Sequence, residues 1–230
     1  MRIRDYVLAT VSGLILSSAA MSHHPGGSLD QEIGGMEKYF QVIDRPAPPF
    51  ELVTAAGKRV GLPDLADRVV VLHFIYTSCP DVCPLHAEKL AEVQSMIAAT
   101  PMEGRVYFVS ITTDPVNDTP GVLAAYGPAR GLDPGNWLFL TIGPEQDENR
   151  TRLLAESYGH RFDKGADGYQ VHGVVSHVID RGGRWAANFH GLEFDSLNMV
   201  LYINGLMNNS YAAEEASEPS WWDRFRQIWN

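Results

Sequence analysis

Apolar runs and amphipathic stretches alternate between residues 50 and 207. The clearest run, Val69–Tyr76, is apolar on both strand faces, which predicts a central strand covered on both sides. Arg105–Thr112 and Trp137–Ile142 repeat this pattern. Shorter strands are expected where apolar residues border turns, at Phe50–Val53, Lys58–Leu62, Val171–Ile179 and Trp185–Phe189.

Helical periodicity fills the segments between these strands. Pro84 suits a first helical position, and Leu90, Val93 and Ile97 mark one face of a helix that ends near Thr100. Further helices are expected after Asp118-Thr119-Pro120, over Glu145–Tyr158 and over Phe194–Met207. The order of elements predicts an α/β protein, a three-layer α/β/α sandwich with a mixed central sheet and an N-terminal β-hairpin.

The two ends of the chain differ from this middle part. Residues 1–20 are typical of a signal peptide or N-terminal anchor, because Arg2 and Arg4 precede an apolar run and a group of small residues. The run is shorter than the roughly 20 residues that span a bilayer. We therefore expect export, to the periplasm or tethered to a membrane facing it. Residues 21–45 resemble a linker, 46–208 form the domain, and 209–230 form a tether and an aromatic amphipathic tail.

Charge and cysteine content narrow the function further. The formal net charge is −10 and the 18 basic residues are scattered, which excludes a nucleic-acid partner. The two cysteines, Cys79 and Cys83, are far from the expected signal, which argues against a bacterial lipoprotein. The 230 residues suit one domain with additions at its ends.

The cysteine pair is the strongest chemical signal. Cys79 and Cys83 lie between a buried strand and the start of a helix. A helix N-terminus favours thiolate over thiol, and two thiolates at this spacing can converge on a soft ion such as Cu(I). The same pair could also close into a disulfide.

A third ligand for such an ion could come from a histidine. His86 follows Cys83 by three residues, on the same side of the helix start. His172 and His177 belong to the later strand, where alternation directs them to opposite faces, so that they cannot both contact one ion.

Three motifs together resemble the Sco (SenC/PrrC) family of copper chaperones. The first is Phe74–Pro84 with its two cysteines, the second is Thr113–Pro120, and the third is the strand with His172, eight residues before Asp180. The resemblance covers about residues 46–207. It implies a thioredoxin-like fold, one copper ion bound by two Cys and one His, and delivery of copper to the CuA centre of cytochrome c oxidase.

Carried onto this sequence, the resemblance implies that Cys79, Cys83 and His172 are the copper ligands. Counting back from the Asp180–Gly183 turn selects His172, and His86 falls where the family varies, as a surface residue or one just behind the ligands. Val171 stands where the family often has Asp, and the span before His172 is one residue shorter than usual. The implied partners are subunit II of the oxidase and other copper carriers.

Asp114 and Asp118 follow a strand end at the same sheet edge as the cysteines. They could support the ligands or face a partner; equally, Asp118 could cap a helix and Asp114 could shape its loop.

Other functions remain open at this point. A thiol:disulfide oxidoreductase that reduces an apo-metalloprotein would need the two cysteines and no histidine. A peroxide reductase would need an activating base or Arg, for which no motif is evident. A zinc site usually has four ligands, or three and a water, and two thiolates with one imidazole suit copper better. The tail, with Trp221, Trp222, Phe225, Ile228 and Trp229 on one side of a short helix, is expected to contact a membrane surface or its own domain.

Overall fold

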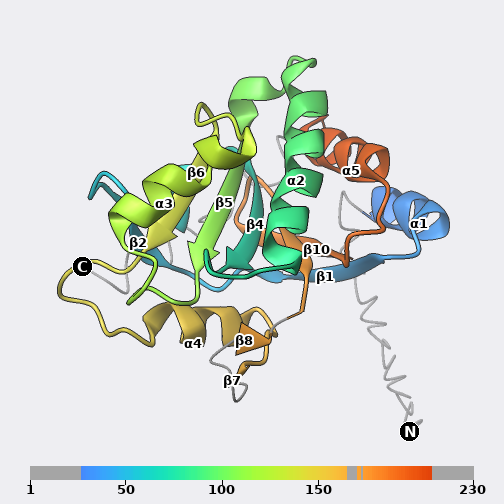
Figure 1. Ribbon diagram of the computed structural model, residues 1–230. Coiled ribbons are helices and arrows are strands. Elements are labelled where there is room, and N and C mark those ends of the chain that lie inside the picture. The colour runs from blue at the N-terminus through green and yellow to red at the C-terminus, as the bar shows by residue number, and fades with distance from the viewer. Residues whose placement is uncertain (1–26, 165–169, 172, 209–230) are drawn as a thin grey trace, which may run out of the picture.

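The central sheet has eight strands in the order β1-β10-β9-β4-β5-β6-β2-β3 (Figure 1). The computed structural model describes residues 27–164, 170–171 and 173–208. The helices are α1 Gly27–Met36, α2 Val82–Ala98, α3 Pro120–Tyr126, α4 Arg150–Ser157 and α5 Ser196–Asn208, with short 3₁₀ helices at Leu62–Leu65, Glu103–Arg105 and Pro128–Arg130. The strands are β1 Phe40–Pro46, β2 Glu51–Thr54, β3 Arg59–Gly61, β4 Val69–Ile75, β5 Val106–Thr112, β6 Trp137–Thr141, β7 Asp163–Lys164, β8 Gln170–Val171, β9 Val175–Ile179 and β10 Arg184–His190.

The centre of the sheet is β4, which is buried at every position as its apolar run predicts. Alternation along β4 divides the interior into two cores. Val69, Val71 and Ile75 contribute to the core under α2, α3 and α5, whereas Val70, Leu72 and Phe74 contribute to the core on the side of α4.

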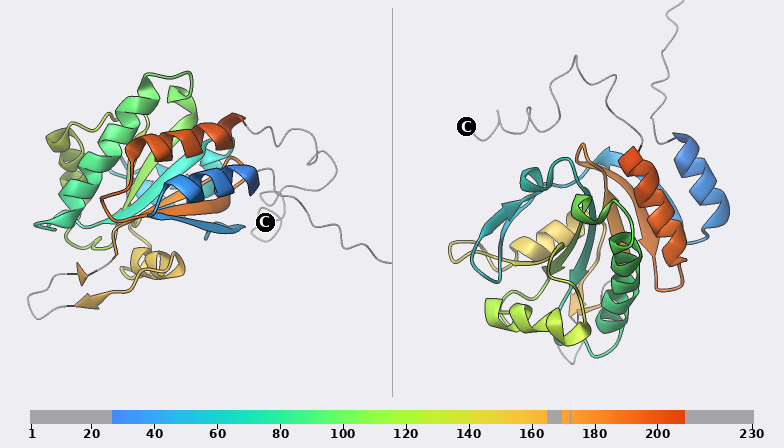
Figure 2. Two further views of the ribbon diagram at one scale, coloured as in Figure 1. Left: turned by 90° about the vertical axis from the view of Figure 1, so that its right-hand side faces the viewer. Right: turned by 90° about the horizontal axis from the view of Figure 1, so that it is seen from above.

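Helices cover both faces of this sheet. In the side view of Figure 2, α5 and α1 lie on one side of the strands and α4 lies on the other. Strands β4, β5 and β6 run parallel, and the remaining pairings of the sheet are antiparallel. The predicted three-layer α/β/α sandwich with a mixed central sheet is therefore confirmed, and the predicted hairpin is β2–β3 at one edge.

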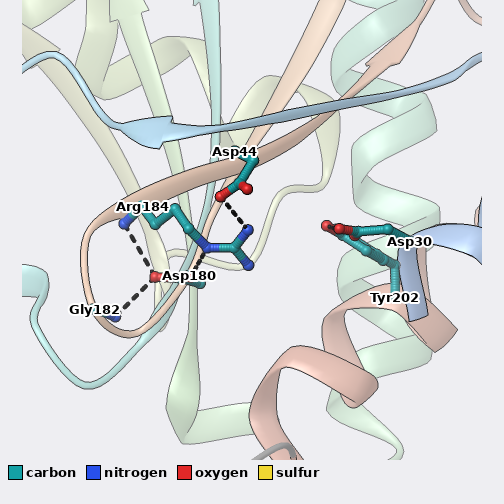
Figure 3. Close-up of polar contacts among 6 residues, drawn as sticks. All are labelled: Asp30, Asp44, Asp180, Gly182, Arg184 and Tyr202. Carbon is teal, nitrogen blue, oxygen red and sulfur yellow. Dashed lines mark hydrogen bonds and ion pairs between the residues drawn. The ribbon is translucent and has the colours of Figure 1, made fainter. Parts of the chain in front are cut away.

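Residues 27–45 belong to the folded unit, so the linker interpretation of residues 21–45 does not hold for them. Strand β1 pairs with β10, and α1 lies beside α5 (Figure 1). The Tyr202 hydroxyl donates a 2.8 Å hydrogen bond to Asp30 of α1 (Figure 3). The close approach of the two helices requires Gly205, where a Cβ would lie 2.5 Å from Leu29 Cδ2. These contacts join residues distant in sequence, which local patterning does not reveal.

The turn between β9 and β10 also fixes β1. Arg184 donates hydrogen bonds to Asp180 at 2.7 Å and to Asp44 of β1 at 3.1 Å (Figure 3). Gly183 has φ of 82°, a left-handed conformation that glycine adopts without strain.

Several boundaries differ from the prediction. Helix α2 begins two residues before Pro84, and α4 begins at Arg150 instead of Glu145. The predicted strand Val171–Ile179 is interrupted, because Gln170–Val171 pairs with Asp163–Lys164 in a separate two-stranded sheet and β9 starts only at Val175. Among the described residues, no helix is both long and apolar enough to span a membrane.

Candidate metal centre

The two cysteines lie in the connection between β4 and α2. Cys79 follows a turn in which its N–H donates to the Tyr76 carbonyl at 3.1 Å. Cys83 is the second residue of α2, and its N–H donates to Cys79 Sγ at 3.3 Å. Both are free thiols and both are buried. The loop therefore brings the two sulfur-bearing residues together at a helix N-terminus, as the sequence predicts.

The surroundings of the two cysteines shift their pKa values in opposite directions. Desolvation acts to raise the pKa of Cys79, but hydrogen bonds from the N–H groups of Asp81 and Cys83 and from the Cys83 and Tyr76 side chains bring it below its usual value. Burial raises the pKa of Cys83 well above its usual range, and the charges of Cys79 and Asp118 raise it further. Cys79 is thus the more acidic member of the pair.

Asp118, in the loop between β5 and α3, forms hydrogen bonds with the loop that holds the cysteines. Its carboxylate is fully buried and accepts hydrogen bonds from the Thr77 N–H at 3.0 and 3.2 Å, and from the hydroxyls of Thr77 and Thr112. The helix cap is instead Thr119, which accepts from the Val122 N–H at 3.4 Å. The predicted capping role of Asp118 is therefore wrong, and its carboxylate instead holds Thr77, two residues before Cys79.

Asp114 has the local role that was considered for it. Its carboxylate accepts from the Asn117 side chain at 2.9 Å, and its N–H donates to Thr112 Oγ1 at 2.9 Å. These bonds shape the loop between β5 and α3.

The edge of the sheet that holds the cysteines also holds the start of β9. Strands β4 and β5 end side by side, with Ile75 opposite Thr112. Strand β9 runs antiparallel to β4, with His177 opposite Leu72 and Val178 opposite Val71. The residues that precede Val175 therefore approach the end of β4. His172 itself lies outside the described residues.

Two histidines considered as ligands have both ring nitrogens engaged with other side chains. His86 is buried, with Nε2 at 2.8 Å from Ser176 Oγ and Nδ1 at 3.4 Å from His73 Nδ1. A surface position for His86 is thus wrong, because this pairing with the sheet draws it into the core. His177 faces away from α2, with Nε2 at 2.9 Å from His160 Nε2 and Nδ1 at 2.8 Å from Asn188 Oδ1.

Sequence reasoning missed one further feature of the site. The Tyr126 hydroxyl is buried and has no hydrogen-bond partner among the described residues. Burial raises its pKa well above the usual range, and the charges of Cys83, Cys79 and Asp118 contribute in the same direction, so that Tyr126 belongs to the surroundings of the cysteines. Nothing in the sequence around Tyr126 indicates that it lies near the cysteines.

The donor set of the described residues fits a soft ion. Two cysteine sulfurs are available, and as thiolates they prefer Cu(I) to hard cations. Over residues 27–164, 170–171 and 173–208, no three His, Cys, Asp or Glu side chains gather as a complete metal site. His172 is not among the residues that this statement covers.

Comparisons with known proteins converge on one family. The model of the SCO1/SenC family matches residues 43–193. A SCO2-like protein of Rickettsia prowazekii is 28% identical over 144 residues, which cover 62% of this chain and 68% of that protein. Solved structures of the same family are also similar to this chain.

The structure of Arabidopsis thaliana ScoI with copper bound is 26% identical, with a TM-score of 0.58, over 71% of this chain and 96% of that one. BsSco, described as a member of the Sco family of cytochrome c oxidase assembly proteins and as having a disulfide switch, has a TM-score of 0.64 over 73% of this chain and 96% of its own. At 22% identity, this second likeness concerns the fold alone.

Proposed function

Because this chain belongs to the SCO1/SenC family, we propose that it binds one copper ion and delivers it to the CuA centre of cytochrome c oxidase. Its fold is the thioredoxin-like fold of the Sco structures, as the sequence predicts. The proposed ligands are Cys79, Cys83 and His172, and the proposed partners are subunit II of the oxidase and other copper carriers.

The observation that carries this proposal is the buried pair of cysteines at the N-terminus of α2. The Cys83 N–H is directed at Cys79 Sγ, and the pKa of Cys79 is lowered. A thiolate of this kind binds Cu(I) with release of its proton, and the second cysteine completes a two-sulfur site. The copper is cargo, and transfer exchanges these sulfur ligands for those of the acceptor without a change in oxidation state.

Two observations support His172 as the third ligand. The start of β9 lies at the edge of the sheet where β4 leads into the cysteine loop. His86 and His177, the other candidates, have both ring nitrogens engaged with side chains. His172 is three residues before β9, so a ligand there would need no rearrangement of the core.

Titration of the reduced chain with Cu(I), against a competing Cu(I) chelator, tests the proposal. We expect one tightly held Cu(I) per chain, and loss of tight binding in Cys79→Ser and in Cys83→Ser, since a hydroxyl replaces a soft thiolate. In His172→Ala, Cu(I) should remain bound, but the thiolate-to-Cu(II) absorption should disappear. The same absorption should persist in His177→Ala. Circular dichroism of both variants shows whether the fold is intact. Full copper affinity in either Ser variant would place the site elsewhere.

A second function is favoured by the difference between the two thiols. A thiol:disulfide oxidoreductase needs one acidic, attacking thiolate and one buried, resolving thiol. Cys79 would attack a partner disulfide, and Cys83 would then displace the partner's sulfur by forming a Cys79–Cys83 disulfide, which leaves the partner reduced by two electrons. Reduction of a disulfide-bonded oxidase fragment by the metal-free chain tests this function. This reduction would persist in His172→Ala, whereas the Cu(II) complex would not.

We propose further that the chain is exported, with residues 1–20 as its signal peptide or anchor, and that residues 220–230 contact a membrane surface. The apolar run with its basic start and the one-sided aromatic pattern support these two points. Flotation with liposomes, for the chain with and without residues 220–230, tests the second point. Equal flotation of the two forms would refute it.

A further inference from the structure

A cavity of about 620 Å³ lies on the α4 side of the sheet, beside β1, β9 and β10. Its polar lining comes from the side chains of Gln41, Arg45, Arg161, Asn188 and His190, together with His160. No Asp or Glu belongs to the described residues that line it. In a chain whose net charge is −10, a cavity lined by two arginines and no carboxylate is an unusual concentration of positive charge.

The side-chain amide oxygens on the cavity wall are already in use. Asn188 Oδ1 accepts from Trp185 Nε1 and from His177 Nδ1, each at 2.8 Å. Gln41 Oε1 accepts from His190 Nε2 at 2.8 Å and from Asn188 Nδ2 at 3.4 Å. Among the amide and guanidinium groups of the lining, hydrogen-bond donors therefore remain, namely the two guanidinium groups and the Gln41 amide nitrogen.

The charge of these arginines is not neutralised within the described part of the chain. The ion pairs found there join Arg59 to Glu51, Lys89 to Glu92, and Arg184 to Asp44 and Asp180. Asp44, next to Arg45 in the sequence, is thus engaged with Arg184 (Figure 3). The Arg45 guanidinium lies over the Trp185 ring, 4.5 Å from its centroid, which fixes its position and leaves its edge N–H groups for a ligand.

The remaining walls are apolar. Ile43, Val175 and the rings of Tyr158 and Trp185 contribute to them, and the Tyr158 hydroxyl is satisfied by the Pro48 carbonyl at 3.1 Å. A volume of this size and a mixture of apolar walls with a few convergent donors are typical of small-molecule sites.

We propose that this cavity binds a small organic carboxylate, with its carboxylate held by Arg45 and Arg161 and its apolar part against Tyr158 and Trp185. Guanidinium groups match the geometry of a carboxylate and form strong charge-assisted hydrogen bonds with it. The site contains neither cysteine and does not depend on the proposed copper function.

Calorimetric and NMR titrations at low salt test this proposal with benzoate, its neutral analogue benzamide, and inorganic phosphate. We expect benzoate to bind saturably and to shift the resonances of the Trp185 indole and the Val175 methyls. Benzamide should bind at least about tenfold more weakly because it lacks the charge that pairs with the arginines. Phosphate, which lacks an apolar part, should also bind more weakly than benzoate.

Variants identify the groups responsible. Arg45→Gln and Arg161→Gln should each weaken benzoate binding about tenfold, and Arg45→Lys should restore part of it. Arg59→Gln, which removes an equal charge from a distant edge strand, is the matched control and should bind as the unaltered chain does. Absence of saturation, equal binding of benzamide and benzoate, or equal weakening in Arg59→Gln would each overturn the proposal. Thermal unfolding of each variant shows whether its fold is kept.

Discussion

The Thr77 N–H donates to both carboxylate oxygens of Asp118, at 3.0 and 3.2 Å. This contact joins the loop after β5 to the segment that leads into Cys79, across 41 positions in the sequence. It keeps a negative charge buried close to the cysteines, where that charge also raises the pKa of Cys83. The β5–α3 loop thus contributes to the site without supplying a ligand.

Replacement of Asp118 tests both parts of this role. Asp118→Asn keeps the shape but loses the charge and at least one hydrogen bond to a charged acceptor, which contributes about 1.5–3 kcal/mol. We expect a loss of stability of that order in urea unfolding, and a pKa of Cys83 that moves down toward its usual value. Asp114→Asn, in the exposed part of the same loop, is the control and should change neither quantity appreciably.

The difference between the two thiols predicts different reactivities. With Cys83 replaced by Ser, Cys79 should react with iodoacetamide at a lower pH than an ordinary cysteine does, because its pKa is lowered. With Cys79 replaced by Ser, Cys83 should react much more slowly and only at higher pH, since burial raises its pKa. The rate of alkylation as a function of pH, followed by mass spectrometry, measures both. Equal rates would contradict the assignment of Cys79 as the attacking thiolate.

Burial of His177 predicts a loss of stability in mild acid. Desolvation, with the charge of His160 added to it, lowers the pKa of His177 well below its usual value near 6.5. The unfolded chain therefore binds a proton below that pH while the folded chain does not, so stability falls as the pH falls below it. The slope approaches about 1.4 kcal/mol per pH unit for this one group.

Urea unfolding between pH 7.5 and 5.5 measures this slope. The Phe74, Tyr158 and Trp185 rings that surround His177 carry no charge in this range. The imidazole of His160 is also in contact with His177, and the charges of His160, His86 and His190 act on its pKa in the same direction as desolvation. His177→Asn should be less stable at neutral pH but should lose less stability on acidification. An unchanged slope in that variant would assign the acid sensitivity to other groups.

The central strands and the cysteine loop could be predicted because their signals are local. The apolar run of β4 specifies burial on both faces, and Cys79 and Cys83 follow it directly in sequence. The contribution of α1 and β1 could not be predicted, since it depends on contacts such as Tyr202 with Asp30. For the same reason the polar residue His86 gives no sign in the sequence that it is buried.

The interruption between β8 and β9 could not be predicted either, because it depends on which strand each segment pairs with. Alternation correctly separates Ser176 from His177, because both lie within β9. It cannot be extended back to His172, since β8 pairs with β7 in a separate sheet and β9 begins three residues later. Strand alternation therefore does not support the proposal of His172 as a ligand, which rests on the family motif and on the position of the start of β9.

A chain of buried hydrogen bonds links α2 to four strands of the sheet, β6, β5, β4 and β9. Trp137 Nε1 donates to Ser110 Oγ at 2.8 Å, and Ser110 Oγ lies 2.6 Å from His73 Nε2. His73 contacts His86, which in turn lies 2.8 Å from Ser176 of β9. Because the chain crosses the core from β6 to β9, it fixes the position of α2, and with it Cys83, relative to the start of β9.

This chain predicts energetic coupling between His86 and Ser176. His86→Leu removes one hydrogen-bond partner of Ser176 and one of His73, and should cost about 2–6 kcal/mol, the sum of two such losses. Ser176→Ala removes one partner and should cost less. In the double variant, the Ser176 hydroxyl is already absent and is not left without a partner. The double variant should therefore lose about 1 kcal/mol less stability than the two single variants lose together. Urea unfolding of the four proteins measures this difference, with Ser95→Ala on the exposed face of α2 as a control for substitution in that helix. Simple additivity would mean that the two side chains act independently and that the 2.8 Å contact does not contribute to holding α2 in place.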